Sequence, residues 1–461
     1  MKSRTGAFLS SCIRMAPALL LGFAAASAQA ATGGDPLRLL LTLETGPYAF
    51  KTSAVARAAA GGFALAYQEI QGSQVGIFVR LFDPSGNPLG GTVQADDGRD
   101  GGAYSPAIAM SAGGAFVVAW LDNTTNSVYA RRFSAAGSPE GGVLTVNAST
   151  KASVSYLSLA TDPAGDFVVA WDDSLVQNNY YIYLGGCTVP GICLPVGYTR
   201  TLTDVYLRRY DGSGIPGAQV TIDSGETLVE AETVLGTGTL SQVDQPTVAM
   251  DPGGDYAIAW QAVNEIGIGV EPSGGEAGTA TAIRLQRFNA QGTALEKPLK
   301  VDSEIRLPGA TRLLDDVTHP VLAAATDSYA LLWVHQESAL YLRQFGSETT
   351  VSGTVTTVPS DPGCGLPSQA DLTSNAVGDL VVIWGCPPFT SIIDAQRYSG
   401  GTTLGPVLNV FVSPNDNTVR PSNATVANDA AGNFVVTWTQ DTLGTDGNFT
   451  GQLVGQLFAG P

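Results

Sequence analysis

Short apolar runs recur along the chain, each ending at an aromatic residue and each bounded by Gly, Pro, Asp, Asn or Ser. Such runs are too short for helices, and their lack of alternation is typical of strands that are buried on both faces. Seven copies predict a repeat protein. The runs are Gly62–Tyr67, Ala115–Trp120, Asp166–Trp171, Asp255–Trp260, Ser328–Trp333, Asp379–Trp384 and Asn433–Trp438.

Each run belongs to a unit of four predicted strands. A first strand leads into a turn such as Asp162–Gly165, and the apolar run follows as the second strand. A third strand ends in a basic or polar residue and an aromatic residue, as in Arg131–Phe133, and a second Gly-containing turn precedes a short fourth strand. Seven such units predict an all-β fold, a seven-bladed β-propeller of four-stranded antiparallel blades.

The seventh unit has no predicted fourth strand after Phe458. The run Leu39–Leu43 precedes Tyr67 at the distance at which Val93 precedes Trp120. We therefore expect residues 38–44 to supply the missing strand and to close the ring at its outer edge, with the first strand of every unit innermost.

The units resemble those of WD-type, Asp-box and other exported bacterial β-propellers, here with an Asp-x-x-Gly-x-Phe-Val-Val-x-Trp pattern. No unit has the Trp-Asp dipeptide after Gly-His, and the Asp-box spacing Asp-x-Gly is replaced by Asp162-x-x-Gly165. The resemblance covers residues 37–461 and implies an architecture. It implies no reaction, because one fold supports many functions.

The first thirty residues have the pattern of a signal peptide. Lys2, Arg4 and Arg14 precede or flank a short apolar run, and Ala28–Ala30 is a small-x-small cleavage site. We expect residues 1–30 to be removed and residues 31–461 to form one secreted or periplasmic domain without a membrane span. The net charge of −18 argues against nucleic-acid binding, which requires cations opposite the phosphates.

Four cysteines lie beyond the predicted cleavage site, and an even number in an exported chain favours two disulfides. The local pairs are Cys187 with Cys193 and Cys364 with Cys386. A zinc site is the alternative, but the sequence has neither a CxxC spacing nor a nearby His.

Three insertions interrupt the repeat, at residues 172–204, 223–244 and 261–281. Their positions in the units place them on one face of the ring, and long loops of this kind are usually functional or disordered. The first carries acidic and aromatic side chains that suit a polar ligand: Asp172, Asp173, Tyr180, Tyr181 and Tyr183. The alternative is that the loops bind nothing.

The same face should carry the mouth of the central channel. The residue before each innermost strand is polar in all seven units, which predicts a ring of donors and acceptors, although strand ends are often polar for purely structural reasons. The seven residues are Thr52, Ser105, Tyr156, Gln245, His319, Gln369 and Asn423.

These patterns favour a monomeric, non-enzymatic binding protein without an essential cofactor, whose ligand is a carbohydrate or a peptide. The alternative is a carbohydrate-active enzyme, a glycosidase or lyase, that uses acidic residues of the same face. A calcium site is a further hypothesis, because Asp441, Asp446 and Asn448 place oxygen ligands on a Gly-containing loop without the spacing of an EF-hand.

Overall fold

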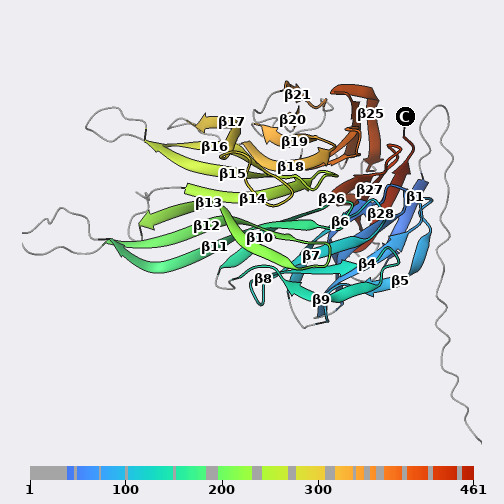
Figure 1. Ribbon diagram of the computed structural model, residues 1–461, viewed down its shortest axis with the longest axis horizontal. Coiled ribbons are helices and arrows are strands. Elements are labelled where there is room, and N and C mark those ends of the chain that lie inside the picture. Colours follow the sequence, from blue (N-terminus) through green and yellow to red (C-terminus); the bar gives the residue numbers. More distant parts are fainter. Residues whose placement is uncertain are drawn as a thin grey trace, which may run out of the picture.

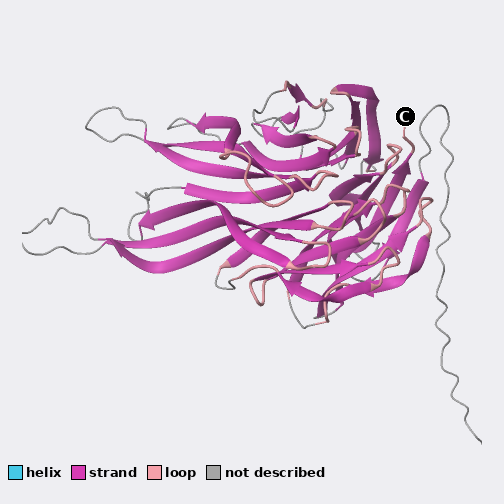
Figure 2. Ribbon diagram, in the orientation of Figure 1, coloured by secondary structure: helices cyan, strands magenta, loops and turns pink. Residues whose placement is uncertain are grey.

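The computed structural model describes residues 39–45, 49–71, 74–98, 102–148, 152–182, 196–230, 241–267, 277–306, 317–335, 339–346, 353–359, 368–386, 392–413, 419–443 and 449–460. Their strands form seven four-stranded antiparallel sheets arranged as a ring (Figures 1 and 2). The predicted seven-bladed β-propeller is confirmed. No helix with the length and apolar character needed to cross a membrane occurs in this part of the chain.

Each blade is built from strands that follow one another in the chain, innermost first. Blades 1 to 3 contain β2 (Ala49–Arg57), β3 (Phe63–Gln71), β4 (Gln74–Phe82) and β5 (Pro88–Gln94); β6 (Ala103–Met110), β7 (Phe116–Asp122), β8 (Ser127–Phe133) and β9 (Pro139–Thr145); β10 (Ser153–Thr161), β11 (Phe167–Ile182), β12 (Val196–Tyr210) and β13 (Pro216–Glu230). Blades 4 and 5 contain β14 (Ser241–Met250), β15 (Tyr256–Gly267), β16 (Ala277–Phe288) and β17 (Leu299–Arg306); β18 (Val317–Ala325), β19 (Ser328–His335), β20 (Ala339–Gly346) and β21 (Val355–Thr357).

Blade 6 contains β22 (Ser368–Ser374), β23 (Leu380–Cys386), β24 (Ile392–Ser399) and β25 (Thr402–Val412). Blade 7 combines β26 (Val419–Asn428), β27 (Phe434–Leu443) and β28 (Phe449–Phe458) with β1 (Leu39–Thr45) from the other end of the chain. β1 pairs antiparallel with β28, with Leu39 opposite Leu457 and Thr45 opposite Gln452. The predicted closure by an N-terminal strand is therefore confirmed.

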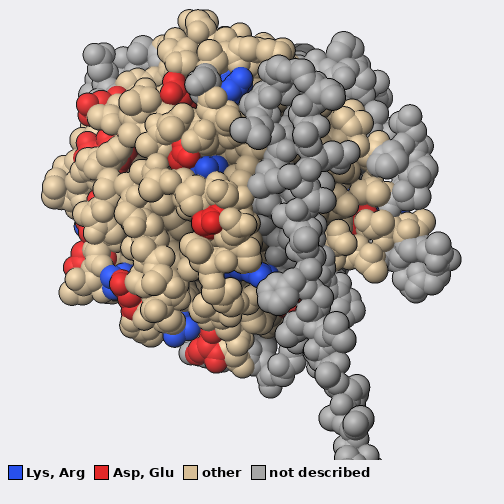
Figure 3. All heavy atoms as spheres, turned by 90° about the vertical axis from the view of Figure 1, so that its right-hand side faces the viewer, with Lys and Arg blue, Asp and Glu red and all other residues tan. Residues whose placement is uncertain are grey.

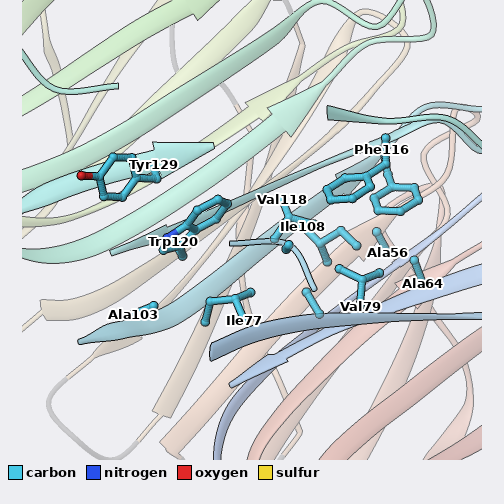
Figure 4. Packing of buried hydrophobic residues seen from close by; sticks show 13 residues of the cluster. Ala56, Ala64, Ile77, Val79, Ala103, Ile108, Phe116, Val118, Trp120 and Tyr129 are labelled. Carbon is cyan, nitrogen blue, oxygen red and sulfur yellow. The ribbon is translucent and has the colours of Figure 1, made fainter. Parts of the chain in front are cut away.

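The second strand of each blade is apolar throughout because both of its faces are covered. In β7, Phe116, Val118 and Trp120 face blade 1, where they share a cluster with Ala64, Ile77 and Val79 (Figure 4). The alternate residues Val117, Ala119 and Leu121 belong to a different cluster, shared with blade 3. All six Trp side chains are buried in such inter-blade clusters, which confirms a structural role for the repeated aromatic residue.

A second aromatic contact explains why the third strands of the seven units end in the same way. The first residue of the second strand lies opposite the last residue of the third, as Phe167 does opposite Tyr210, and their rings stack with centroids 4.5 Å apart. Such cross-strand pairs stabilise a sheet by about 0.5–1.5 kcal/mol beyond their buried area. The same stacked arrangement joins Phe63 to Phe82, Phe116 to Phe133, Tyr256 to Phe288, Tyr329 to Phe345 and Phe434 to Phe458.

Side chains at one position of the innermost strands connect neighbouring blades. Each accepts a hydrogen bond from a backbone N–H in the innermost strand of the next blade: Ser158 Oγ from Val248 (3.0 Å), Thr247 Oγ1 from Leu322 (3.1 Å) and Asp371 Oδ2 from Val426 (2.9 Å). Buried backbone donors are thereby satisfied where no ladder exists between blades.

The sequence suggested that the three insertions are long loops. In their described residues they are instead paired strands. β11 and β12 stay paired from Phe167 opposite Tyr210 to Ile182 opposite Val196, and β13 follows β12 out to Glu230. β15 and β16 likewise remain paired as far as Gly267 and Ala277. In their described residues, the insertions are extensions of the blade 3 and blade 4 sheets, and these extended strands project together beyond the ring (Figure 1).

We call the face from which these extensions project the insertion face. On the opposite side of the molecule, acidic side chains are scattered among basic ones (Figure 3).

Candidate functional site

Every innermost strand is interrupted by a β-bulge at the same place. The register with the second strand shifts between Tyr104 and Ala107 in β6, and equivalent shifts occur in the other six blades. The extra residues include all seven members of the predicted polar ring. Four of them have a left-handed backbone, with φ of 48° at Ser105, 53° at Gln245, 55° at His319 and 52° at Asn423.

A non-glycine residue with positive φ is uncommon, and bulges often redirect side chains next to functional sites. Here the bulges lie at the insertion-face mouth of a central channel that is lined by the innermost strands and encloses about 730 Å³. Thr52, Ser105, Tyr156 and Asn423 line this channel. Tyr156 is 44% exposed, an unusual degree for a large aromatic residue at such a position.

Asp172 lies immediately after the blade 3 Trp and is only 3% exposed. Its Oδ1 accepts a hydrogen bond from the Tyr156 N–H at 2.8 Å, and its Oδ2 accepts one from the Gln245 N–H at 3.1 Å. The carboxylate thus holds the bulges of blades 3 and 4 together. Burial raises the pKa of Asp172 to about 7, against the opposing effect of these two amides.

The contact continues into blade 5. Gln245 Oε1 accepts a hydrogen bond from the His319 N–H at 2.9 Å, and the exposed His319 ring lies 2.9 Å from the hydroxyl of Thr318. The structure therefore brings together four of the predicted site residues: Asp172, Tyr156, Gln245 and His319. Their hydrogen bonds position the mouth and do not by themselves reveal a ligand.

The side chain of Asp173 lies on the other face of the sheet from that of Asp172, because successive residues of a strand point to opposite faces. It lies opposite Asp204 of β12, whose carboxylate accepts hydrogen bonds from the hydroxyls of Tyr206 and Ser224. Burial, and then the charge of Asp204, raise the pKa of Asp173 to about 6. The two acidic residues predicted as one group thus belong to different environments.

The predicted tyrosines lie far from the mouth. Tyr180 and Tyr181 are near the tip of β11, opposite Tyr198 and Gly197. Eight residues separate Tyr180 from Asp172, which corresponds to roughly 25 Å along a strand. The sequence suggested that these tyrosines lie together with Asp172 and Asp173, but their strand positions are far from those two residues. Tyr183 lies outside the described residues.

Several other predicted residues also fall outside the described part of the chain. They include the signal peptide, Cys187, Cys193, Cys364, Asp446 and Asn448; Gln369 and Cys386 are described only as strand positions. Asp441 lies in β27 opposite Gly451. Among the described residues, no three His, Cys, Asp or Glu side chains are grouped so that they could hold a metal ion.

Sequence reasoning missed two partly buried acidic residues, of which Asp223 joins blade 3 to blade 4. Asp244 immediately precedes Gln245, accepts a hydrogen bond from Gln242 at 2.7 Å, and has its pKa raised to about 6 by burial. Asp223 of β13 accepts hydrogen bonds from the Trp260 indole and the Arg284 guanidinium of the next blade, both at 2.8 Å. Asp223 lies 13 residues after Tyr210, much as Asp302 lies 14 residues after Phe288, and only this offset could have indicated it.

No family model matches the chain, and no curated protein matches it in sequence. Solved structures resemble it in overall fold. An α-L-arabinanase from Penicillium chrysogenum, solved with arabinobiose, is 11% identical with a TM-score of 0.44, covering 91% of this chain and 98% of its own.

Two further structures are also similar. The polysaccharide lyase Uly1 is 10% identical with a TM-score of 0.44, covering 87% and 90% of the two chains. The fucose-specific lectin from Aleuria aurantia is 13% identical with a TM-score of 0.36, covering 80% and 98%. No activity or ligand follows from likenesses at this level.

Proposed function

We propose that the protein is an exported, non-enzymatic binding protein that holds a carbohydrate at the insertion-face mouth of its channel. The observation that carries this proposal is the presence of an exposed aromatic ring and an unsatisfied hydroxyl group at the same mouth. Tyr156 offers a ring face on which a sugar could stack, and Thr52, two blades away, lines the same channel.

The hydroxyl of Thr52 supports this reading. Thr52 Oγ1 is buried and has no hydrogen-bond partner within the described residues, and the neighbouring Ser53 Oγ is in the same condition. A buried hydroxyl left unsatisfied costs about 1–3 kcal/mol, so both groups favour a partner that donates and accepts hydrogen bonds. Sugar hydroxyls do both.

The proposal is tested with a glycan array and a peptide array probed with residues 31–461. The glycan hit is then titrated calorimetrically against the parent, Tyr156→Ala and Tyr156→Phe. We expect Tyr156→Ala to weaken binding about tenfold, corresponding to about 1.4 kcal/mol, and Tyr156→Phe to retain most of the affinity. Leu89→Ala, on the outer strand β5, is the control for an exposed apolar residue remote from the channel.

A hit confined to peptides, or parent-like binding by Tyr156→Ala, would contradict the proposal.

The enzymatic alternative rests on Asp173 and Asp204, which face each other across β11 and β12. A carboxyl group with its pKa raised to about 6 could act as a general acid in glycoside chemistry. Asp172 is less suited, because both of its oxygens accept backbone hydrogen bonds. Release of product from the array hit, abolished by Asp173→Asn, would favour this alternative over simple binding.

A further inference from the structure

Arg57 is the last residue of β2, at the end of the channel opposite the insertion face. The equivalent residues of the other innermost strands, at the same offset from the bulge, are uncharged: Met110, Thr161, Met250, Ala324, Ser374 and Asn428. Arg57 is therefore the one cation in this layer of the described channel wall. Because the other six blades form without a charge at this position, the blade structure does not require Arg57.

The Arg57 side chain is almost fully buried. It is 3% exposed, and its Nη2 forms an ion pair with Asp429 Oδ2 at 3.1 Å, Asp429 being 4% exposed. Its Nε and Nη1 are also buried and have no hydrogen-bond partner within the described residues. Charged donors left without acceptors in a protein interior are costly, so these two nitrogens favour an acceptor brought close to Arg57.

Arg57 lines a cavity of about 190 Å³ at this end of the channel. At about 30 Å³ per water molecule it has room for roughly six waters, or for one sugar ring or small polyol. Besides Arg57, its lining includes Thr161, Asp162, Asp251 and Asn375. The cavity thus combines open cationic donors with carboxylate and amide groups.

The charge balance disfavours an anion, because three carboxyl groups, those of Asp162, Asp251 and Asp429, line the same cavity as the single guanidinium. The geometry of the open nitrogens points the same way. A guanidinium binds one carboxylate through two N–H groups, either those of Nε and Nη2 or those of Nη1 and Nη2. Both pairs include Nη2, and here Nη2 is already bound to Asp429. Nε and Nη1 are left to bind two separate acceptors. Hydroxyl groups satisfy this requirement and can also donate to the carboxylates.

We propose that Arg57, Asp162, Asp251 and Asn375 form a second binding site, which takes a neutral polyol or a single sugar residue at the end of the channel opposite the insertion face. This site is independent of the one around Tyr156. It would be reached from the opposite face or through the channel, and it would bind weakly, since a cavity of this size contacts only one small ligand.

The experiment follows the Arg57 Nε–H signal by NMR in the full chain labelled with ¹⁵N-arginine. The signal is assigned by its absence in Arg57→Lys. Xylose and arabinitol serve as neutral probes, and glucuronate and inorganic phosphate as anionic probes, each titrated to high millimolar concentration. We expect a saturable shift of the Arg57 signal with a neutral probe, and no change in this response in Tyr156→Ala.

Because loss of Arg57 alone would leave Asp429 buried and unpaired, the matched variant combines Arg57→Met with Asp429→Asn. This variant should fold, and calorimetry should show that it has lost the polyol binding seen with the parent. A response to the anionic probes alone would overturn the proposal in favour of an anion site. The absence of any response would overturn it in favour of a hydrated ion pair.

Discussion

Asp172 of blade 3 accepts a hydrogen bond from the backbone N–H of Gln245 in blade 4, at 3.1 Å, while its other oxygen holds the Tyr156 N–H of its own blade. One carboxylate therefore sets the relative position of two bulges at the channel mouth. This contact joins residues that are 73 positions apart in the chain. It also makes the mouth sensitive to pH.

Burial raises the pKa of Asp172 from 3.8 to about 7, so the folded state binds a proton more readily than the unfolded state between these values. Stability from this group is therefore greatest at low pH and declines as the pH rises from about 4 to 7. We expect Asp172→Asn to flatten this decline. Denaturant titrations of parent and variant at pH 5 and pH 8 measure the difference, and equal pH dependence in the two proteins would contradict the assignment.

Thr247→Val should destabilise the ring. The substitution keeps the shape of the side chain but removes the hydroxyl that accepts the Leu322 N–H, which leaves a buried donor unsatisfied. We expect the free energy of unfolding to fall by about 1–3 kcal/mol, measured by urea titration. Val321→Thr is the matched control, because blade 5 has an apolar residue at the equivalent position and no such bond to lose; a comparable loss in both variants would show that the hydroxyl is not the cause.

Removal of residues 1–45 should open the ring. β28 would then lose the antiparallel ladder that it forms with β1 and would become an exposed edge strand. We expect a lower melting temperature, a broader transition and a greater tendency to aggregate than in a chain that lacks only residues 1–38. Identical melting of the two truncated chains would mean that β1 does not close the ring.

Shortening the blade 3 extension should leave the ring folded. Deletion of residues 176–202 together with residues 226–230 removes the outer part of all three paired strands, whereas the inter-blade clusters lie nearer the Trp residues. We expect nearly unchanged melting and retained binding of the glycan found on the array, because Tyr156 and Thr52 lie at the channel mouth and not on the deleted tip. Loss of that binding in a protein that still melts like the parent would show that the extension also holds the ligand.

The blade number, the strand order within each blade and the closing strand could be predicted from the sequence, because they depend on local patterns. The second strand, such as Phe116–Asp122, is covered on both faces in every blade, so it must be apolar throughout. The aromatic residue at the blade interface recurs every 51–54 residues, except where the insertions lengthen the interval to 89 and 73. Even the polar ring could be located, since each bulge interrupts the repeat at one fixed position.

Only the tertiary structure decided what these residues do. Asp172 was predicted from the sequence as a ligand contact, and the structure adds that its two oxygens accept backbone N–H bonds, because the packing of blade 4 against blade 3 places Gln245 beside it. The insertion that contains Tyr180 was predicted to be a loop, but it is extended sheet, because β13 runs back along β12 and satisfies its backbone groups. Arg57 gave no signal in the sequence. Its unsatisfied nitrogens indicate a binding site only because the seven innermost strands surround one cavity. That arrangement depends on contacts between residues far apart in the chain.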